Sequence, residues 1–227
     1  MPRNPRCVLP DLPYHITQRG TNRQPVFHSA ADRRIYLNLI RENLADAGVR
    51  VLAYCLMTNH VHWLVVPERE ESLAILFRRA HGRYAQAYNA RRQRSGHLWQ
   101  NRFFSCPLSG QHLWIALRYV EQNPVRALLA PLPEDYAWSS AAPHLTGHRD
   151  RAGLLDMRFW EQSGGADAWR VMHAAAEDAR ATQLLRRCTY SGRPFGPEEF
   201  IERLEQKFAR KWRRWAFDQS TQVSAAP

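Results

Sequence analysis

Residues 54–66 read Tyr54-Cys55-Leu56-Met57-Thr58-Asn59-His60-Val61-His62-Trp63-Leu64-Val65-Val66, an apolar and β-prone stretch that ends just before Pro67. Because alternate side chains of a strand share a face, a strand through this stretch places His60 and His62 on the same face. That face also carries Leu52, Tyr54, Leu56, Leu64 and Val66. The other face carries Ala53, Cys55, Met57, Val61, Trp63 and Val65. Both faces are largely apolar, which predicts a central strand that is covered on each side.

The two histidines permit two interpretations. On a strand, the backbones of His60 and His62 lie roughly 6.5–7 Å apart, a distance at which two imidazole rings can bind one divalent ion. A His-x-His pair also occurs as two hydrogen-bonded histidines inside a core, and the spacing alone favours that simpler interpretation. The pair by itself therefore leaves both possibilities open.

The flanking patterns predict an α+β fold. Apolar residues recur at strand or helix spacing in five further segments, and Gly48 and the Asn123-Pro124 pair are typical helix ends. The expected strands are residues 14–20 and 98–104, and the expected helices are residues 30–47, 72–90 and 111–122. The order strand, helix, strand, helix, strand, helix indicates helices packed on one sheet.

The character of the chain changes after about residue 150, so we expect a catalytic or binding domain over residues 1–150 and a helical, basic C-terminal extension over residues 151–227. The extension contains an alanine-rich helix over residues 166–187 and a helix that starts at Pro197. The apolar stripe of that last helix is Ile201, Leu204, Phe208, Trp212 and Trp215. Its basic side chains are Arg203, Lys207, Arg210, Lys211, Arg213 and Arg214. A solvated face and a DNA contact both explain them. Disorder is expected from Gln219.

The composition points to a nucleic-acid partner. A chain of 227 residues with 44% hydrophobic side chains can bury a sizeable core. Its 32 Lys and Arg outnumber 21 Asp and Glu, and the formal net charge of +11 predicts attraction to polyanions. Nearly all of the positive charge is arginine, which suits bidentate contacts with phosphate and stacking on bases.

The cysteine pattern and the hydropathy indicate a cytoplasmic, nucleoid-associated protein. Cys7, Cys55, Cys106 and Cys188 are widely spaced, form no C-x-x-C pair and are typical of reduced thiols. No apolar run reaches about 18 residues, so no membrane partner is expected. The N-terminus lacks the apolar core of a signal peptide.

A cationic segment is the first candidate DNA-binding feature. Aromatic side chains alternate with arginines in it, a mixture that suits single-stranded nucleic acid. Seven arginines and no acidic residue occupy it: Arg78, Arg79, Arg83, Arg91, Arg92, Arg94 and Arg102. Arg19 and Arg23 crowd the predicted turn at Gly20 and are added to the candidate DNA-binding residues. The alternative is that the aromatic rings are core residues and the arginines are merely solvated.

The second candidate feature is at the end of the helix over residues 111–122. Tyr119 and Asn123 are four residues apart and share one helix face. The Asn123 amide oxygen can join an ion held by His60 and His62, and the Tyr119 hydroxyl then lies beside that ion. A phenol is a weak nucleophile at its ordinary pKa near 10, so a cation that polarises a phosphate makes it useful. The alternative is that Tyr119 is a half-buried structural residue of the helix, which is equally compatible with its spacing from Asn123.

The motifs together resemble the HUH single-strand nucleases and, among them, the REP-associated tyrosine transposases of the single-tyrosine superfamily. The similar segments are residues 54–62, 96–103 (Gly96-His97-Leu98-Trp99-Gln100-Asn101-Arg102-Phe103), 119–127 (Tyr119-Val120-Glu121-Gln122-Asn123-Pro124-Val125-Arg126-Ala127) and 138–140 (Trp138-Ser139-Ser140). They occur in the family's order over roughly residues 12–145. The resemblance implies a ferredoxin-like, RRM-like antiparallel sheet with helices packed on it, the HUH nuclease core.

The resemblance also implies a mechanism. His60, His62 and Asn123 bind Mg²⁺ or Mn²⁺, although some relatives use glutamine as the third ligand. Tyr119 attacks single-stranded DNA that folds as repetitive extragenic palindromic hairpins, and it forms a 5′-phosphotyrosine that a 3′-hydroxyl can reverse. Relatives include monomers and homodimers, so the oligomeric state is open.

Two rival functions are also compatible with the sequence. One is a nucleic-acid-binding protein or regulator that has lost catalysis. The other is a two-histidine phosphoesterase, suggested by His15-Ile16-Thr17. That chemistry needs a second His-x-Thr or His-x-Ser motif, which His60-Val61-His62 does not supply.

Overall fold

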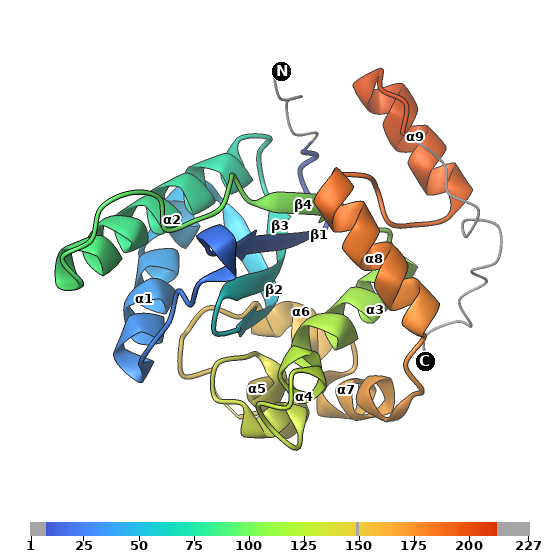
Figure 1. Ribbon diagram of the computed structural model, residues 1–227. Helices are drawn as coiled ribbons and strands as arrows, with labels where there is room; N and C mark the ends of the chain where they lie inside the picture. Colours follow the sequence, from blue (N-terminus) through green and yellow to red (C-terminus); the bar gives the residue numbers. More distant parts are fainter. Residues whose placement is uncertain (1–7, 149, 213–227) are drawn as a thin grey trace.

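The computed structural model describes residues 8–148 and 150–212, and its centre is a four-stranded antiparallel sheet (Figure 1). The strands are β1 (Tyr14–Arg19), β2 (Val49–Leu56), β3 (His60–Pro67) and β4 (Phe104–Pro107), and they lie in the order β2-β3-β1-β4. One helix connects β1 to β2 and another connects β3 to β4. This is the ferredoxin-like α+β fold that the sequence predicts, and β3 is a central strand.

Two long helices, α1 (Ala30–Ala47) and α2 (Ser72–Arg91), pack together on one face of the sheet. The Ser29 side chain caps α1 by accepting a hydrogen bond from the backbone N–H of Asp32. Gly48 ends the helix with a φ of 61°, a left-handed conformation that costs glycine little. The core on this face takes Val61, Trp63 and Val65 from β3, so the predicted alternation of β3 is confirmed.

The opposite face is covered by α3 (Gly110–Glu121), which lies on β2 and β3, and by α8 (Ala179–Ser191), which lies on β4 and β1. Leu64 and Val66 of β3 enter this second core, together with Leu117 and Leu185. The remaining elements of the described chain are η1 (Thr21–Arg23), α4 (Asn123–Arg126), η2 (Pro133–Asp135), α5 (Ala141–Thr146), α6 (Met157–Gln162), α7 (Gly165–Ala174) and α9 (Glu198–Phe208).

The expectation of one continuous strand through residues 52–66 is wrong. The segment is a β-hairpin, in which β2 and β3 pair antiparallel and residues 57–59 form the turn. A register shift between Val51 and Ala53 also changes the alternation of β2. Tyr54 and Leu56 therefore face α1 and α2, away from the two histidines. The polar residues Thr58 and Asn59 that interrupt the apolar stretch are the signal for this turn.

The predicted strand over residues 98–104 is also misplaced, because β4 begins only at Phe104. Leu98 and Phe103 are buried, as in a strand, but the segment between them is a loop that bonds to β1 near its end. The backbone N–H of Gln100 donates to the carbonyl of Arg19 at 2.9 Å, and the N–H of Thr21 donates to the carbonyl of Leu98 at 2.9 Å. This loop and α2 form the walls of a groove.

The expected helix over residues 166–187 is two helices, α7 and α8. Ala175 is extended, and the Asp178 carboxylate starts α8 by accepting from the backbone N–H groups of Arg180 and Ala181. Helix α9 starts after Pro197 as predicted and ends at Phe208, although Trp212 still joins its apolar cluster. The predictions for Cys7, Arg213, Arg214, Trp215 and the segment from Gln219 concern positions outside the described residues. None of the helices in the described ranges has the length and hydropathy of a membrane span.

A buried carboxylate ties the extension to α3. Glu121, the last residue of α3, is fully buried and accepts hydrogen bonds from Ser140 (2.6 Å), His144 Nδ1 (2.6 Å) and His173 Nε2 (2.8 Å). Burial alone would raise the pKa of Glu121, but the hydrogen bonds and charges of His144 and His173 hold it at about 2. His173 belongs to α7, so residues on both sides of position 150 share this core. The division into residues 1–150 and 151–227 stays a prediction.

We expect Glu121→Gln to lower the free energy of unfolding by about 3 kcal/mol, because it leaves buried donors without their carboxylate. For a chain of this size, the melting temperature then falls by roughly 6–12 °C. The matched control is Glu42→Gln, which removes a half-exposed carboxylate paired with Arg83 and costs less than about 0.5 kcal/mol. Thermal and urea unfolding measure both. Equal, small losses in the two variants would contradict a structural role for the cluster.

Candidate active site

The described structure brings His60, His62 and Tyr119 together on the α3 side of the sheet. The rings of His60 and His62 are 4.9 Å apart between centroids and nearly perpendicular. The ring of Tyr119, near the end of α3, lies 5.4 Å from that of His62 and is also nearly perpendicular to it. His62 is 3% exposed and Tyr119 is 7% exposed. Two residues from one strand and one from a distant helix therefore form a compact, largely buried group.

A chain of hydrogen bonds fixes the tautomer of His62. The hydroxyl of Thr189 donates to the carbonyl of Leu185 at 2.8 Å, so its oxygen must accept from Nδ1–H of His15, 2.7 Å away. A neutral His15 then has an unprotonated Nε2, which accepts from Nδ1–H of His62 at 2.9 Å. The lone pair of His62 is therefore on Nε2. This atom is buried and has no hydrogen-bond partner among the described residues.

A second chain fixes the tautomer of His60 in the same way. The side-chain amide nitrogen of Asn59 donates to the carbonyl of Arg23 at 2.9 Å, which identifies the other amide atom as the oxygen. That oxygen accepts from Nδ1–H of His60 at 2.6 Å. The lone pair of His60 is therefore also on Nε2. Both histidines offer the nitrogen that a metal ion requires, and each proton is held by a partner outside the site.

The environment keeps these rings neutral. Burial lowers the pKa of His15 to about 3. Burial, together with the positive charges of Arg19 and Arg186, lowers the pKa of His60 to about 4. Burial also lowers the pKa of His62 well below its ordinary value. Neutral imidazole is the form that binds a cation, so at neutral pH no proton competes for the two Nε2 atoms.

The donor set fits a divalent cation that takes the rest of its ligands from oxygen. No group of three or more His, Cys, Asp or Glu side chains in the described ranges is arranged for metal binding. A third protein ligand beside the histidine pair would therefore be an amide or hydroxyl oxygen. Asn123, the first residue of α4, is 9% exposed, and its Nδ2 donates to the carbonyl of Val120 at 3.4 Å. This bond leaves Oδ1 as the atom with ligand character. The role of Asn123 stays a prediction.

Arginines surround Tyr119. The guanidinium of Arg126 lies 4.6 Å from the centroid of the Tyr119 ring and donates a hydrogen bond to its backbone carbonyl. Burial raises the pKa of Tyr119, while the charges of Arg186 and Arg126 act against this rise. The hydroxyl is therefore protonated at neutral pH, in a field that favours its anion. The site can hold an anionic phosphate beside the phenol.

Sequence reasoning singled out only part of this group. Arg19, predicted to bind DNA, does lie near His60 and donates to the hydroxyl of Tyr190 on α8 at 3.0 Å. Arg126 is within residues 119–127, but no pattern in that segment indicates its contact with the Tyr119 ring. Arg186 and Thr189 are on α8, and no sequence signal connects that helix to the histidines. Only the packing of α8 on β1 and β4 brings them there.

His15 does not have the role that a histidine of a two-histidine phosphoesterase would have. Both of its ring nitrogens are engaged, one with His62 and one with Thr189, and it is 1% exposed. The hydroxyl of Thr17 donates to the carbonyl of Val61 at 3.0 Å, within the sheet. Neither side chain of the His-x-Thr motif is available to a substrate, so the geometry does not support two-histidine chemistry.

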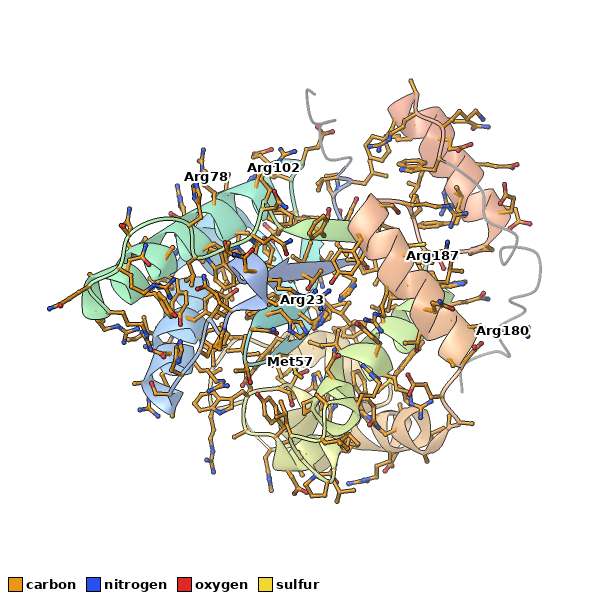
Figure 2. The ribbon with its side chains drawn as sticks, viewed as in Figure 1. Arg23, Met57, Arg78, Arg102, Arg180 and Arg187 are labelled. Carbon is orange, nitrogen blue, oxygen red and sulfur yellow. The ribbon has the colours of Figure 1, made fainter. Side chains whose placement is uncertain are left out.

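The arginine segment divides into two groups. Acidic side chains of α1 neutralise four of its members: Arg79 pairs with Asp46 (3.3 Å), Arg83 with Glu42 (2.9 Å), and Arg91 and Arg92 with Asp32 (2.8 Å each). Arg94 donates to the side-chain oxygen of Gln24 at 3.0 Å. Arg78 and Arg102 make no ion pair within the described residues and line one groove (Figure 2). Arg23 lies in η1, in the turn after β1. The DNA-binding role of these arginines stays a prediction.

Comparisons with known proteins identify a family and a similar fold. The family of IS200-like transposases matches residues 8–123, just over half of the chain. A solved REP-associated tyrosine transposase, bound to a REP hairpin, superimposes with a TM-score of 0.55 at 16% identity and covers 66% of this chain and 89% of its own. A structure from Deinococcus radiodurans described as a transposase covers 53% of this chain and 96% of its own at 17% identity, with a TM-score of only 0.37. No curated protein sequence matches significantly.

A family match over more than half of the chain defines this protein as one of the transposase class. The family match covers both histidines and Tyr119 and ends at Asn123. The chain belongs to the family of IS200-like transposases.

The hydrogen-bond chain to His62 yields a test that does not require catalysis. We expect Thr189→Val to weaken Mn²⁺ binding by roughly tenfold or more, because the proton on His15 loses its acceptor and the His62 tautomer is no longer fixed. Titration of the protein with MnCl₂, followed by electron paramagnetic resonance, measures the affinity. The matched control is Thr182→Val on the same helix, whose hydroxyl bonds Glu177 instead. Unchanged Mn²⁺ affinity in the Thr189 variant would show that the chain does not orient His62.

Proposed function

We propose that this transposase is a metal-dependent single-stranded DNA endonuclease and strand transferase that works through a 5′-phosphotyrosine on Tyr119. The observation that carries the proposal is the pair of Nε2 lone pairs on His60 and His62 beside the ring of Tyr119. A core histidine pair would normally have its buried nitrogens hydrogen-bonded. The Nε2 atom of His62 is instead buried without a hydrogen-bond partner among the described residues, as expected of a nitrogen that binds a metal ion.

In this proposal, His60, His62 and the amide oxygen of Asn123 hold Mg²⁺ or Mn²⁺. The ion, when bound, stabilises charge on the phosphoryl oxygens. His15 and Asn59 keep the protons of the two imidazoles turned away from the ion. Arg126 and Arg186 reduce the cost of forming the Tyr119 phenolate as the hydroxyl proton leaves.

The reaction that fits these groups is a transesterification. The oxygen of Tyr119 forms a bond to phosphorus, the bond from phosphorus to the 3′-oxygen breaks, and that oxygen leaves as a 3′-hydroxyl after taking up a proton. The number of phosphodiester-type bonds is conserved, so the 3′-hydroxyl of another strand can reverse the step and join DNA. No nucleotide cofactor is needed for the joining step.

The substrate class we propose is hairpin-forming repetitive extragenic palindromic DNA with single-stranded flanks. The fold of a REP-associated transposase bound to such a hairpin supports it, as does the formal charge of +11. A catalytically inactive binding protein is the remaining alternative. The two Nε2 lone pairs beside Tyr119 favour an enzyme over that alternative.

Tyr119→Phe should abolish the covalent adduct while fold and hairpin affinity barely change, because it removes one hydroxyl and keeps the ring. A 3′-labelled hairpin is incubated with protein and Mn²⁺, and a denaturing gel reveals labelled protein. The control is Tyr88→Phe, whose hydroxyl lies on the α1 and α2 side and donates to the carbonyl of Pro25. Labelled protein from the Tyr119 variant would assign the nucleophile elsewhere, and Tyr190, 42% exposed, would be tested next.

His60→Ala and His62→Ala should each abolish cleavage and largely spare DNA binding. A lost metal ligand removes the ion, whereas phosphate affinity depends mainly on arginines. Hairpin binding by fluorescence anisotropy and cleavage on a gel are measured on the same preparations. Cleavage at the wild-type rate by either variant, in buffer freed of metal with a chelator, would rule out the assigned metal site.

A further inference from the structure

A groove of about 780 Å³ lies between α2 and the loop of residues 96–103, apart from the histidine pair. The alternation of β1 places Gln18 on the α2 side of the sheet, and His15 on the opposite side. Apolar and aromatic side chains line the groove, among them Phe77, His81 and Trp99. Its size is within the range of clefts that bind small organic groups, roughly 300–1,000 Å³. The loop is the motif of residues 96–103, and none of its residues belongs to the candidate active site.

One of the residues that line the groove, Gln18, has an unsatisfied hydrogen-bond acceptor. Gln18 is 3% exposed, and its Nε2 donates to the backbone carbonyl of Asn101. Because a carbonyl oxygen only accepts, the amide atom that faces it must be nitrogen, and Oε1 is the other atom. Oε1 is buried and has no partner in the described structure. A buried orphan acceptor in a cleft calls for a ligand that brings an N–H or O–H donor.

The ring surfaces and the charges at the groove suit a nucleotide. Trp99 is partly exposed, its Nε1–H donates to the carbonyl of His81 at 3.1 Å, and its ring centroid lies 4.8 Å from that of His81. The indole is therefore held in place as a flat surface. Arg78 on α2 and Arg102 on the loop are exposed, line the groove and make no ion pair within the described residues (Figure 2). Both can contact phosphate.

We propose that this groove binds one unpaired base of the single-stranded DNA that flanks the hairpin. The Watson–Crick edge of the base, where every base has at least one N–H donor, meets Oε1 of Gln18. The base stacks beside Trp99, and the adjacent phosphates contact Arg78 and Arg102. The proposal rests on the proposed function, since it names a second contact of the same DNA, and it places recognition of a base away from the cleavage centre.

The test is a scan for missing bases. The probe is a DNA hairpin with oligo(dT) flanks in which single thymidines are replaced, one position at a time, by an abasic nucleotide. Binding is measured by fluorescence anisotropy in the presence of a chelator, so that cleavage plays no part. Loss of one stacked base should weaken wild-type binding by roughly tenfold at one flank position and little elsewhere. A flat scan would overturn the proposal.

Gln18→Leu then connects the sensitive position to the groove. This variant keeps a side chain of similar size and removes the acceptor, so intact DNA should bind a few-fold more weakly and the abasic penalty should shrink at that position alone. A melting curve confirms that the variant is folded. An undiminished abasic penalty in a folded Gln18→Leu protein would place the base elsewhere and overturn the proposal.

The arginines provide an independent comparison that does not alter the core. The double variant Arg78→Ala with Arg102→Ala should make the slope of log affinity against log salt shallower, by the equivalent of about one to two phosphate contacts. Arg50→Ala with Arg170→Ala, which removes arginines outside the candidate DNA-binding set that are already paired with Asp156 and Asp167, should leave it nearly unchanged. The reverse ranking would overturn the proposal. Formation of the Tyr119 adduct is measured separately. Negative binding results at the groove therefore do not contradict the proposed function, and absence of the adduct does not contradict base binding in the groove.

Discussion

The orientation of two imidazole rings determines what this site can do, and that orientation is fixed by groups outside the site. Each ring donates its Nδ1 proton to a neighbour, His15 for His62 and Asn59 for His60. Each of these chains ends at a backbone carbonyl, that of Leu185 or that of Arg23. Carbonyl oxygens cannot donate, so the direction of every hydrogen bond in the two chains follows from their ends. The position of both Nε2 lone pairs is therefore a consequence of the tertiary packing around the two rings.

This arrangement makes the C-terminal part of the chain a component of the site. Thr189 and Arg186 come from α8, which packs on β4 and β1, and α7 is tied to the end of α3 through His173 and Glu121. The ferredoxin-like sheet presents the histidine pair, and α3, packed on β2 and β3, presents Tyr119. Helix α8 then fixes the tautomer of His62 through Thr189 and His15, and its Arg186 adds positive charge near the phenol.

The arginine-rich α2 shows that sequence charge and available charge differ. Asp32, Glu42 and Asp46 on α1 neutralise four arginines of the segment between residues 78 and 102, because α1 and α2 pack side by side. Those ion pairs lower the net positive charge of the α1 and α2 face. Arg78 and Arg102, outside this arrangement, border the groove that contains the unsatisfied oxygen of Gln18.

The sequence by itself determined the two long helices and identified His60, His62 and Tyr119 of the candidate site. Periodicity predicted α1 and α2 to within a residue at each end and placed His60 and His62 on one face, since these patterns depend only on local spacing. It missed the turn at residues 57–59 despite the local signal of Thr58 and Asn59. It failed where non-local pairing decides the outcome, in the register shift in β2 and the late start of β4. Only the tertiary structure showed that His15 and Thr189, 174 positions apart, complete the histidine site, because side chains so distant in sequence meet only when the sheet and α8 are packed together.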